Sequence, residues 1–353
     1  MTIVQLSTAH AFDLLLRQSP QGDGRWEDID VRLGADADKE ADWLIVFDHP
    51  ARDLTTCLPR ERRIVFLPEP ASIKHYDPQF IAQFGVAFTA SPLPDFDGIA
   101  IHTQPLTPWF YGAGIGASAQ TTARKSYAEL AAGPIAGEGA GGRGEEGARG
   151  LLSAVCSTKT LNRNQVRRLR FLRRVKATLG ARLDIYGRGF QEIADKAEGL
   201  DGYRYHLVLE NNLDPHCWTE KLADPLLAGV YPIFAGGPDL EAYFDPLGFT
   251  AIDITRPDSA LAGIVRVLAE DPVSRPEVRA AMRENRRRLM EEHQFFPVLA
   301  AELSRLGPAP ATRLEAPVPV RPPVKPPLHR LTRAFRPLRI LADKAHVALV
   351  ERG

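Results

Sequence analysis

The sequence has 353 residues, with 44 Lys and Arg against 44 Asp and Glu, so its formal net charge at pH 7 is zero. At roughly 100–200 residues per domain, this length indicates two domains. The balanced charge excludes a protein governed by one strong overall field, such as a basic nucleic-acid coat. Three cysteines exclude a disulfide scaffold and indicate a reducing compartment. No apolar run reaches the roughly 20 residues of a membrane span, and the first residues lack the features of a signal peptide, so a cytoplasmic protein is expected.

The first part of the chain contains three short apolar runs bounded by turn residues. Such runs are typical of buried parallel strands. A helical pattern, AFDLLLRQS, precedes them at residues 11–19. The runs themselves are WLIVFD, RRIVFLP and VAFTAS, at residues 43–48, 62–68 and 86–91.

Residues 131–150 separate two domains in this prediction. They contain eight Gly and five Ala without hydrophobic periodicity, so they cannot offset the entropy cost of ordering and indicate a flexible linker. An N-terminal domain is then expected at 1–130 and a C-terminal domain at 151–306.

The second part alternates strand-like and helical patterns. Its strand-like runs are LLSAVCS, ARLDIYG, YHLVLEN, VYPIFAG and FTAIDI, and its helical patterns are VRRLRFLRRVKATLG, TEKLADPLLAG and the Arg-rich stretch 278–306. This alternation in both halves predicts an α/β fold of two Rossmann-like domains that face each other across a cleft. Ligands of such folds bind at the carboxyl ends of the strands, so the cleft is the expected site.

The tail, residues 307–353, is rich in proline and basic residues. Eight prolines in 308–327 predict an extended polyproline segment. Residues 321–353 hold eight Lys or Arg and two acids, and apolar residues recur there at helical spacing. Two interpretations stay open: an amphipathic helix on the inner, anionic face of a membrane, or a terminal helix packed on the protein.

The segment 203–238 carries the most informative chemistry. A strand ends at Glu210 and Asn211, and after a polar loop Thr219 is a good N-cap for a helix. Glu220 suits the positive end of the helix dipole, whereas Lys221 is unfavourable there unless an anion is bound. Free N–H groups at a helix start together with a lysine indicate a phosphate site. An ordinary strand, loop and helix with capping residues is the alternative.

This segment, YRYHLVLEN…TEKLADPLLAGVYPIFAGGP, resembles the donor-binding signature of glycosyltransferase family 10, the α1,3/α1,4-fucosyltransferases. The resemblance extends through CSTKTLNRNQVRRLRFL and RLDIYGRGF upstream and LEAYFDPLGFTAIDI downstream, so it covers residues 155–254. It implies a GT-B-like inverting glycosyltransferase. Such an enzyme transfers fucose from GDP-fucose, as donor substrate, to a hydroxyl of a glycan or lipid-linked glycan acceptor. No cofactor and no metal are expected, because protein cations would stabilise the diphosphate.

The resemblance assigns the diphosphate contacts to Lys221 and Arg168. Arg168 is chosen among the arginines of its helix because Arg-Leu-x-Phe-Leu matches the family's helix heading. A single arginine here could equally lie on a solvated face. However, eight Lys or Arg without an acid across 159–176 favour anion binding for the cluster.

The remaining donor contacts also follow from the resemblance. Glu220 would bond hydroxyls of the ribose or fucose, and Asn211 would help to shape the pocket. Glu210 would orient the loop or the donor. Trp218 stands where the family usually has Tyr or Phe, and would stack on the base or pack on the sugar.

Glu69, in FLPEPAS, looks like the catalytic base of the family's Glu-x-Pro turn. At a strand's carboxyl end and between two prolines it would be held rigidly, and partial burial would make it more basic. The alternative is a turn carboxylate that caps nearby N–H groups. Asp95, Asp97 and His102 are rival bases nearby.

Two other functions stay open. One is a transferase for another nucleotide sugar. The other is a non-catalytic GT-B-like protein that binds an anionic polymer or a membrane surface. Binding to nucleic acid is not expected, because aromatic residues do not interleave with the arginines.

Overall fold

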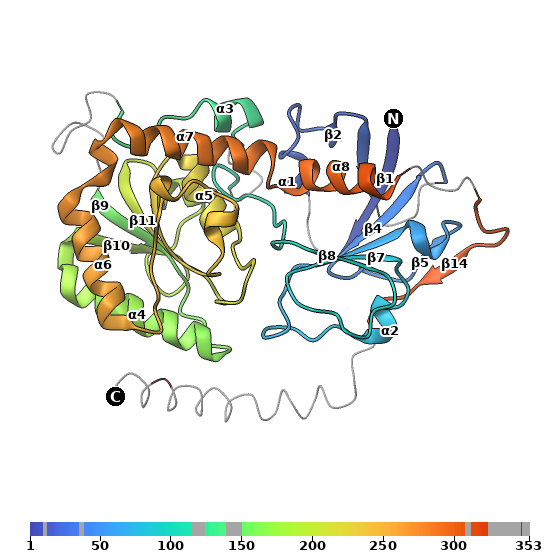
Figure 1. The fold of residues 1–353 in the computed structure, drawn as a ribbon, viewed down its shortest axis with the longest axis horizontal. Coiled ribbons are helices and arrows are strands. Elements are labelled where there is room, and N and C mark those ends of the chain that lie inside the picture. Colours follow the sequence, from blue (N-terminus) through green and yellow to red (C-terminus); the bar gives the residue numbers. More distant parts are fainter. Residues whose placement is uncertain are drawn as a thin grey trace. The chain divides into compact units, whose positions relative to one another are not determined.

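The structure, a computed structural model, describes residues 1–9, 13–34, 39–114, 124–138, 150–307, 312–323 and 347. It divides into two compact units (Figure 1). Unit 1 comprises Met1–Trp109, Ser126–Ala128 and Met290–Pro326, and unit 2 comprises Phe110–Lys125, Glu129–Leu289 and Pro327–Gly353. Most of the predicted linker, 139–149, and the predicted tail helix lie outside the described residues.

Unit 1 is built on a seven-stranded sheet with the order β2-β3-β1-β4-β6-β7-β8. All neighbouring strands are parallel except β2, which runs antiparallel to β3. The strands are β1 (Thr2–Thr8), β2 (Arg25–Trp26), β3 (Ile29–Leu33), β4 (Trp43–Phe47), β6 (Arg63–Leu67), β7 (Val86–Thr89) and β8 (Ile99–His102). Short helices α1 (Asp13–Leu16) and α2 (Pro78–Ile81) belong to this unit.

The three predicted strands of unit 1 are the central strands β4, β6 and β7. Every residue in them is buried, as expected for a parallel sheet that is covered on both faces. Their continuous apolar character therefore reflects burial on two sides.

Helix α8 (Phe295–Leu306) completes the core of unit 1, although the sequence placed residues up to 306 in the second domain. Its buried residues Phe295, Phe296 and Leu299 join the cluster formed by the strands, and the ring of Phe295 lies 5.2 Å from that of Phe66. Figure 1 shows α8 beside β1 and β2. The structure thus assigns this helix to unit 1 because its apolar face is buried there.

Unit 2 contains a five-stranded, wholly parallel sheet with the order β10-β9-β11-β12-β13. The strands are β9 (Gly150–Val155), β10 (Leu183–Tyr186), β11 (Tyr203–Leu209), β12 (Tyr231–Ala235) and β13 (Thr250–Ala251). The helices are α4 (Arg163–Leu179), α5 (Glu220–Ala228), α6 (Pro257–Glu270) and α7 (Pro276–Glu291). Helix α3 (Tyr127–Ala131) begins in unit 1 and ends in unit 2. The two parallel sheets confirm the predicted α/β class.

The Arg-rich stretch 278–306 forms two helices, where the pattern predicted one run. Helix α7 ends at Glu291 and α8 starts at Phe295. The side chain of Gln294 accepts a hydrogen bond from the N–H of Phe296 and caps the new helix. None of the helices within the described ranges is long and apolar enough to cross a membrane.

Part of the proline-rich segment is a strand and not a free polyproline helix. Strand β14 (Val318–Val320) pairs antiparallel with β5 (Leu54–Thr56). Val320 is fully buried in an apolar cluster of unit 1. Alternating valine and proline leaves one face apolar, and that face packs on unit 1.

Candidate functional site

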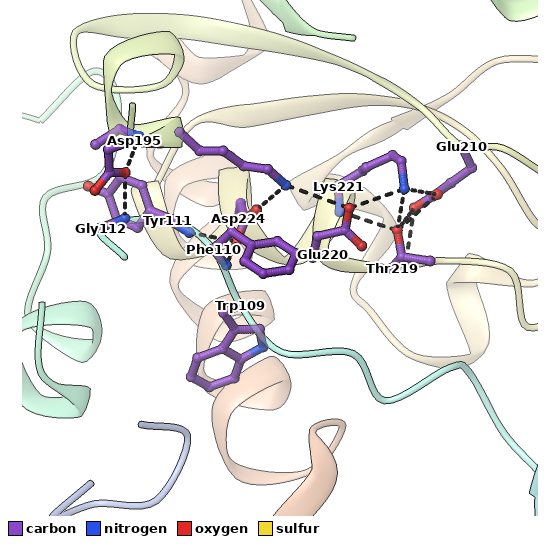
Figure 2. A network of polar contacts seen from close by, with 12 residues as sticks. Trp109, Phe110, Tyr111, Gly112, Asp195, Glu210, Thr219, Glu220, Lys221 and Asp224 are labelled. Carbon is purple, nitrogen blue, oxygen red and sulfur yellow. Dashed lines mark hydrogen bonds and ion pairs between the residues drawn. The ribbon is translucent and has the colours of Figure 1, made fainter. Parts of the chain in front are cut away.

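The start of α5 lies against Glu210, the residue that follows β11 (Figure 2). Thr219 is the N-cap predicted from the sequence, and its hydroxyl accepts a hydrogen bond from the N–H of Lys221. The N–H of Thr219 donates to Oε1 of Glu210 at 2.8 Å, and its Oγ1 lies 2.9 Å from both carboxylate oxygens. Because the Glu210 side chain is fully buried, its contacts here are with the loop and the helix start.

Lys221 lies between two carboxylates. Its Nζ is 3.3 Å from Oε2 of Glu210 and 3.2 Å from Oε1 of Glu220, and 3.0 Å from Oγ1 of Thr219. Burial opposes the charge of the ammonium, but the two carboxylates outweigh it and raise the pKa of Lys221. Lys221 is therefore a permanent cation at the positive end of α5, the arrangement that favours a bound anion.

Glu220 is held ionised by the lysines around it. Burial acts to raise the pKa of its carboxyl, but Lys221 and then Lys196 lower that pKa to about 2. A carboxylate in this state accepts hydrogen bonds and donates none. It can therefore bind hydroxyl groups of a ligand.

The row of charges continues to Lys196 and Asp224, which the sequence analysis did not single out. Nζ of Lys196 lies 2.6 Å from Oδ2 of Asp224, and the other oxygen of Asp224 accepts the N–H groups of Phe110 and Tyr111 (Figure 2). Asp224 stands four residues after Glu220, so helical spacing could have indicated it. Lys196 is distant in sequence, and only the folded structure brings it here.

Arg168 lies in α4 with 3% of its surface exposed. One guanidinium N–H donates to Oδ1 of Asn211 at 2.6 Å, and another donates to the carbonyl of Ser157 at 3.3 Å. Its Nε is buried without a hydrogen-bond partner, and within the described ranges no carboxylate pairs with it. A buried guanidinium without a counter-ion is costly, so this group suits an anionic ligand.

Arg168, Asn211, Glu210, Glu220 and Lys221 all gather where β9 and β11 end. The positive charge of Arg168 also acts on Lys221 and on the thiol of Cys156, whose pKa burial raises. Arg168 bonds Asn211 and Lys221 pairs with the preceding residue, Glu210, so both cations lie at the end of β11. This edge of the unit 2 sheet is where parallel α/β folds bind ligands.

Trp218, the residue before Thr219, packs in an aromatic cluster. It is 3% exposed, and its ring meets Tyr243 and Phe244 edge-on at centroid distances of 5.5 and 5.2 Å. Its indole N–H has no hydrogen-bond partner. Because almost none of its surface is exposed, Trp218 packs as a core residue in this structure.

The loop around Trp218 also contains His216 and Cys217. Nδ1 of His216 lies 2.6 Å from the hydroxyl of Tyr243 and 2.9 Å from Oδ2 of Asp239. No group of three His, Cys, Asp or Glu residues in the described part of the chain is arranged to hold a metal ion.

Glu69 belongs to unit 1, just beyond β6, and is exposed where the sequence predicted partial burial. It lines a pocket of about 270 Å³ together with the rival bases Asp95 and Asp97. Asp97 also pairs with Arg60. His102 ends β8 and is exposed. The burial prediction was wrong because the two prolines hold the turn without covering the glutamate between them.

The loop that carries Glu69 is tethered to a buried aspartate. The N–H of Glu69 donates to the hydroxyl of Tyr76 at 3.3 Å, and that hydroxyl donates to Oδ1 of Asp48 at 2.9 Å. Asp48 is buried at the end of β4 and also pairs with Lys74. Burial and the charge of Asp48 raise the pKa of Tyr76, which keeps the hydroxyl protonated and able to donate.

No protein-family model and no curated protein sequence matches the chain. Among solved structures it is similar to an α1,3-fucosyltransferase, at 14% sequence identity and a TM-score of 0.50, over 90% of this chain and 92% of that one. Structures of α1,3-fucosyltransferase with GDP and with GDP-fucose match at 15% and 13% identity, with TM-scores of 0.47 and 0.44. They cover 79% and 84% of this chain and 81% and 92% of those chains.

The chain thus has the GT-B fold, with two units that are each built on a parallel sheet. Within that class, one solved protein with a similar fold over most of its length is an α1,3-fucosyltransferase.

Proposed function

We propose that the protein is a glycosyltransferase of the family 10 type, with GDP-fucose as the donor and a hydroxyl of a glycan as the acceptor. The observation that carries the proposal is the buried guanidinium of Arg168, which has no carboxylate partner among the described residues and lies, like Lys221, at the end of β11. The segment that resembles the family's donor signature supplies both cations. The shared GT-B fold supports the same conclusion.

The cations in unit 2 suit a leaving nucleoside diphosphate. Negative charge develops on the diphosphate as the bond to the sugar breaks, and fixed cations stabilise that charge most strongly where water is excluded. Arg168 offers a planar fork and Lys221 a point charge at the start of α5. The proposal needs no metal ion, because these groups supply the positive charge.

The reaction in this proposal is a single inverting displacement. Glu69 takes the proton from an acceptor hydroxyl, the acceptor oxygen bonds to the anomeric carbon, and the bond from that carbon to GDP breaks with the electron pair leaving on GDP. Glu220 binds donor hydroxyls through its ionised carboxylate. Asn211, which holds Arg168, orients the guanidinium for the diphosphate.

A thermal-shift panel tests the donor class. GDP and GDP-fucose should raise the melting temperature of the protein, whereas UDP-sugars and ADP-sugars at the same concentration should not, because ligand that binds only the folded state stabilises it. If only another nucleotide sugar raises the melting temperature, that nucleotide sugar, and not GDP-fucose, is the donor. No shift with any nucleotide would contradict the assignment of unit 2 as a donor-binding unit.

A further inference from the structure

Lys196 occupies a fixed position beside the proposed donor site, although the donor signature does not include it. It begins a short 3-10 helix (Lys196–Gly199), and its side chain is 11% exposed. The ammonium lies 2.6 Å from Oδ2 of Asp224 and 3.7 Å from Oε1 of Glu220. It therefore bridges the first and second turns of α5.

The anchor of Lys196 cannot easily move. Asp224 is 1% exposed, and its other oxygen is occupied by the N–H groups of Phe110 and Tyr111 at 2.8 and 2.9 Å (Figure 2). The ring of Phe110 lies 5.1 Å from Nζ of Lys196 and covers it. A buried carboxylate with both oxygens engaged fixes the ammonium, and the ammonium in turn attracts Glu220.

We propose that Lys196 is a positioning residue of the donor site: held by Asp224, its ammonium fixes the Glu220 carboxylate so that it faces the hydroxyls of the donor. This inference rests on the proposed function, in which Glu220 contacts those hydroxyls. It assigns Lys196 a role in donor affinity that does not require contact with the donor.

The charged groups around Glu220 determine how the pKa of Glu220 responds when Lys196 is removed. Lys221 and Lys196 face its carboxylate as cations, and Glu210 and Asp224 are the neighbouring carboxyls. Removing Lys196 leaves one cation near Glu220, so its pKa rises from about 2 toward the ordinary value of 4.5. Glu220 then takes up a proton at a higher pH, and a protonated carboxyl loses the charge that binds hydroxyls.

The test is the affinity of the full-length protein for GDP-fucose, measured by titration calorimetry at several pH values between about 7 and 3.5, a range that crosses the pKa expected for Glu220 without Lys196. We expect the ratio of the Kd of Lys196→Met to that of the wild type to grow at least about fivefold as the pH falls across this range. Lys196→Arg keeps the charge, so its ratio should stay within about twofold. Lys125→Met removes another half-buried lysine of unit 2, which bonds the hydroxyl of Tyr111, and should leave the ratio flat.

Each outcome decides the proposal. The positioning role would be overturned if the ratio of the Kd of Lys196→Met to that of the wild type did not change with pH, or if the ratio for Lys196→Arg rose equally. The proposed function would stay in place in both cases. A wild type that does not bind GDP or GDP-fucose would overturn both. If Lys196→Met fails to fold because Asp224 is left unpaired, the double variant Lys196→Met/Asp224→Asn removes both charges, and the same criterion applies to it.

Discussion

Arg168 differs from the other arginines of α4 in what surrounds it. The helix carries a row of basic residues, but Arg168 is among its buried residues and holds Asn211 from inside the unit. Its neighbour Arg167 is more exposed and donates to Asn164 at 2.8 Å. The two residues have the same chemistry, so burial alone marks Arg168 as the one suited to bind a ligand.

Substitution of Arg168 by lysine tests whether donor binding needs the planar, two-pronged guanidinium or only a positive charge at this position. Arg168→Lys keeps the positive charge but cannot bind a diphosphate and Asn211 in the same planar geometry. We expect kcat/KM for GDP-fucose to fall at least about tenfold, equivalent to about 1.4 kcal/mol of transition-state stabilisation.

Steady-state kinetics measures this effect, with Arg167→Lys as the matched control. The control variant should remain within about twofold of the wild type. Equal rates for Arg168→Lys and the wild type would remove Arg168 from the donor site.

At the scale of elements, the loop between β6 and α2 is the segment that places Glu69. It is fixed by the contact of its backbone with Tyr76 and by the contacts of Tyr76 and Lys74 with Asp48. Asp48 itself has a positive φ of 63°, a conformation that costs most residues energy and that Asp tolerates better than most. The chain thus turns after β4, and the carboxylate of Asp48 reaches the loop that carries Glu69.

Tyr76→Phe should loosen this loop without removing the aromatic ring. The N–H of Glu69 would lose its acceptor, so its amide should exchange with solvent faster in hydrogen-exchange measurements. If Glu69 is the base, kcat for transfer should fall about tenfold while the Kd for GDP-fucose stays constant.

Tyr231→Phe is the control for that measurement, because its hydroxyl meets Thr250 at 3.0 Å in unit 2, whereas the loop belongs to unit 1. Faster exchange at Glu69 together with an unchanged kcat would argue against Glu69 as the base and in favour of Asp95 or Asp97.

At the scale of the whole molecule, unit 1 is not a continuous stretch of the chain. The chain forms most of unit 1, then unit 2, and then contributes Met290–Pro326 to unit 1. Phe296 shows why: it is fully buried, and its ring is nearly parallel to that of Trp26 at 6.2 Å. The core of unit 1 is incomplete without a segment that follows unit 2 in sequence.

Phe296→Ala should therefore destabilise unit 1 and not unit 2. Loss of a buried phenylalanine typically costs about 3–5 kcal/mol. Hydrogen exchange should become faster in β1, β4 and β6, whereas the protection of β9 and β11 should be unchanged. Val265→Ala, in an exposed position on α6 of unit 2, is a control that should alter neither. Loss of protection in both units together would show that they unfold as one.

The central strands were predictable because burial on both faces leaves a continuous apolar run in the sequence. WLIVF and VAFT show this in unit 1, and YHLVL shows it in unit 2. The strands β1, β2, β3 and β8 of unit 1 were not predicted. Strand β8 reads IAIH, so it is apolar, but it is only four residues long and three of them are exposed. The break between α7 and α8 was missed because apolar residues recur on both sides of it, in RRRLM before it and FFPVL after it.

What the sequence by itself determined is the local chemistry: a strand ending in Glu210, an N-cap at Thr219 and a lysine in the first turn of α5. These depend on neighbours within a few residues, so a pattern can indicate them. What only the tertiary structure decided is which groups meet across the sheet: Lys196 against Asp224 and Glu220, Arg168 against Asn211, Trp218 inside an aromatic cluster, and Glu69 left exposed. Burial and long-range ion pairing are properties of the packed chain, and net charge and spacing do not report them. The zero net charge of the sequence therefore says little about the site, where three lysine and arginine cations and three carboxylates lie together within unit 2.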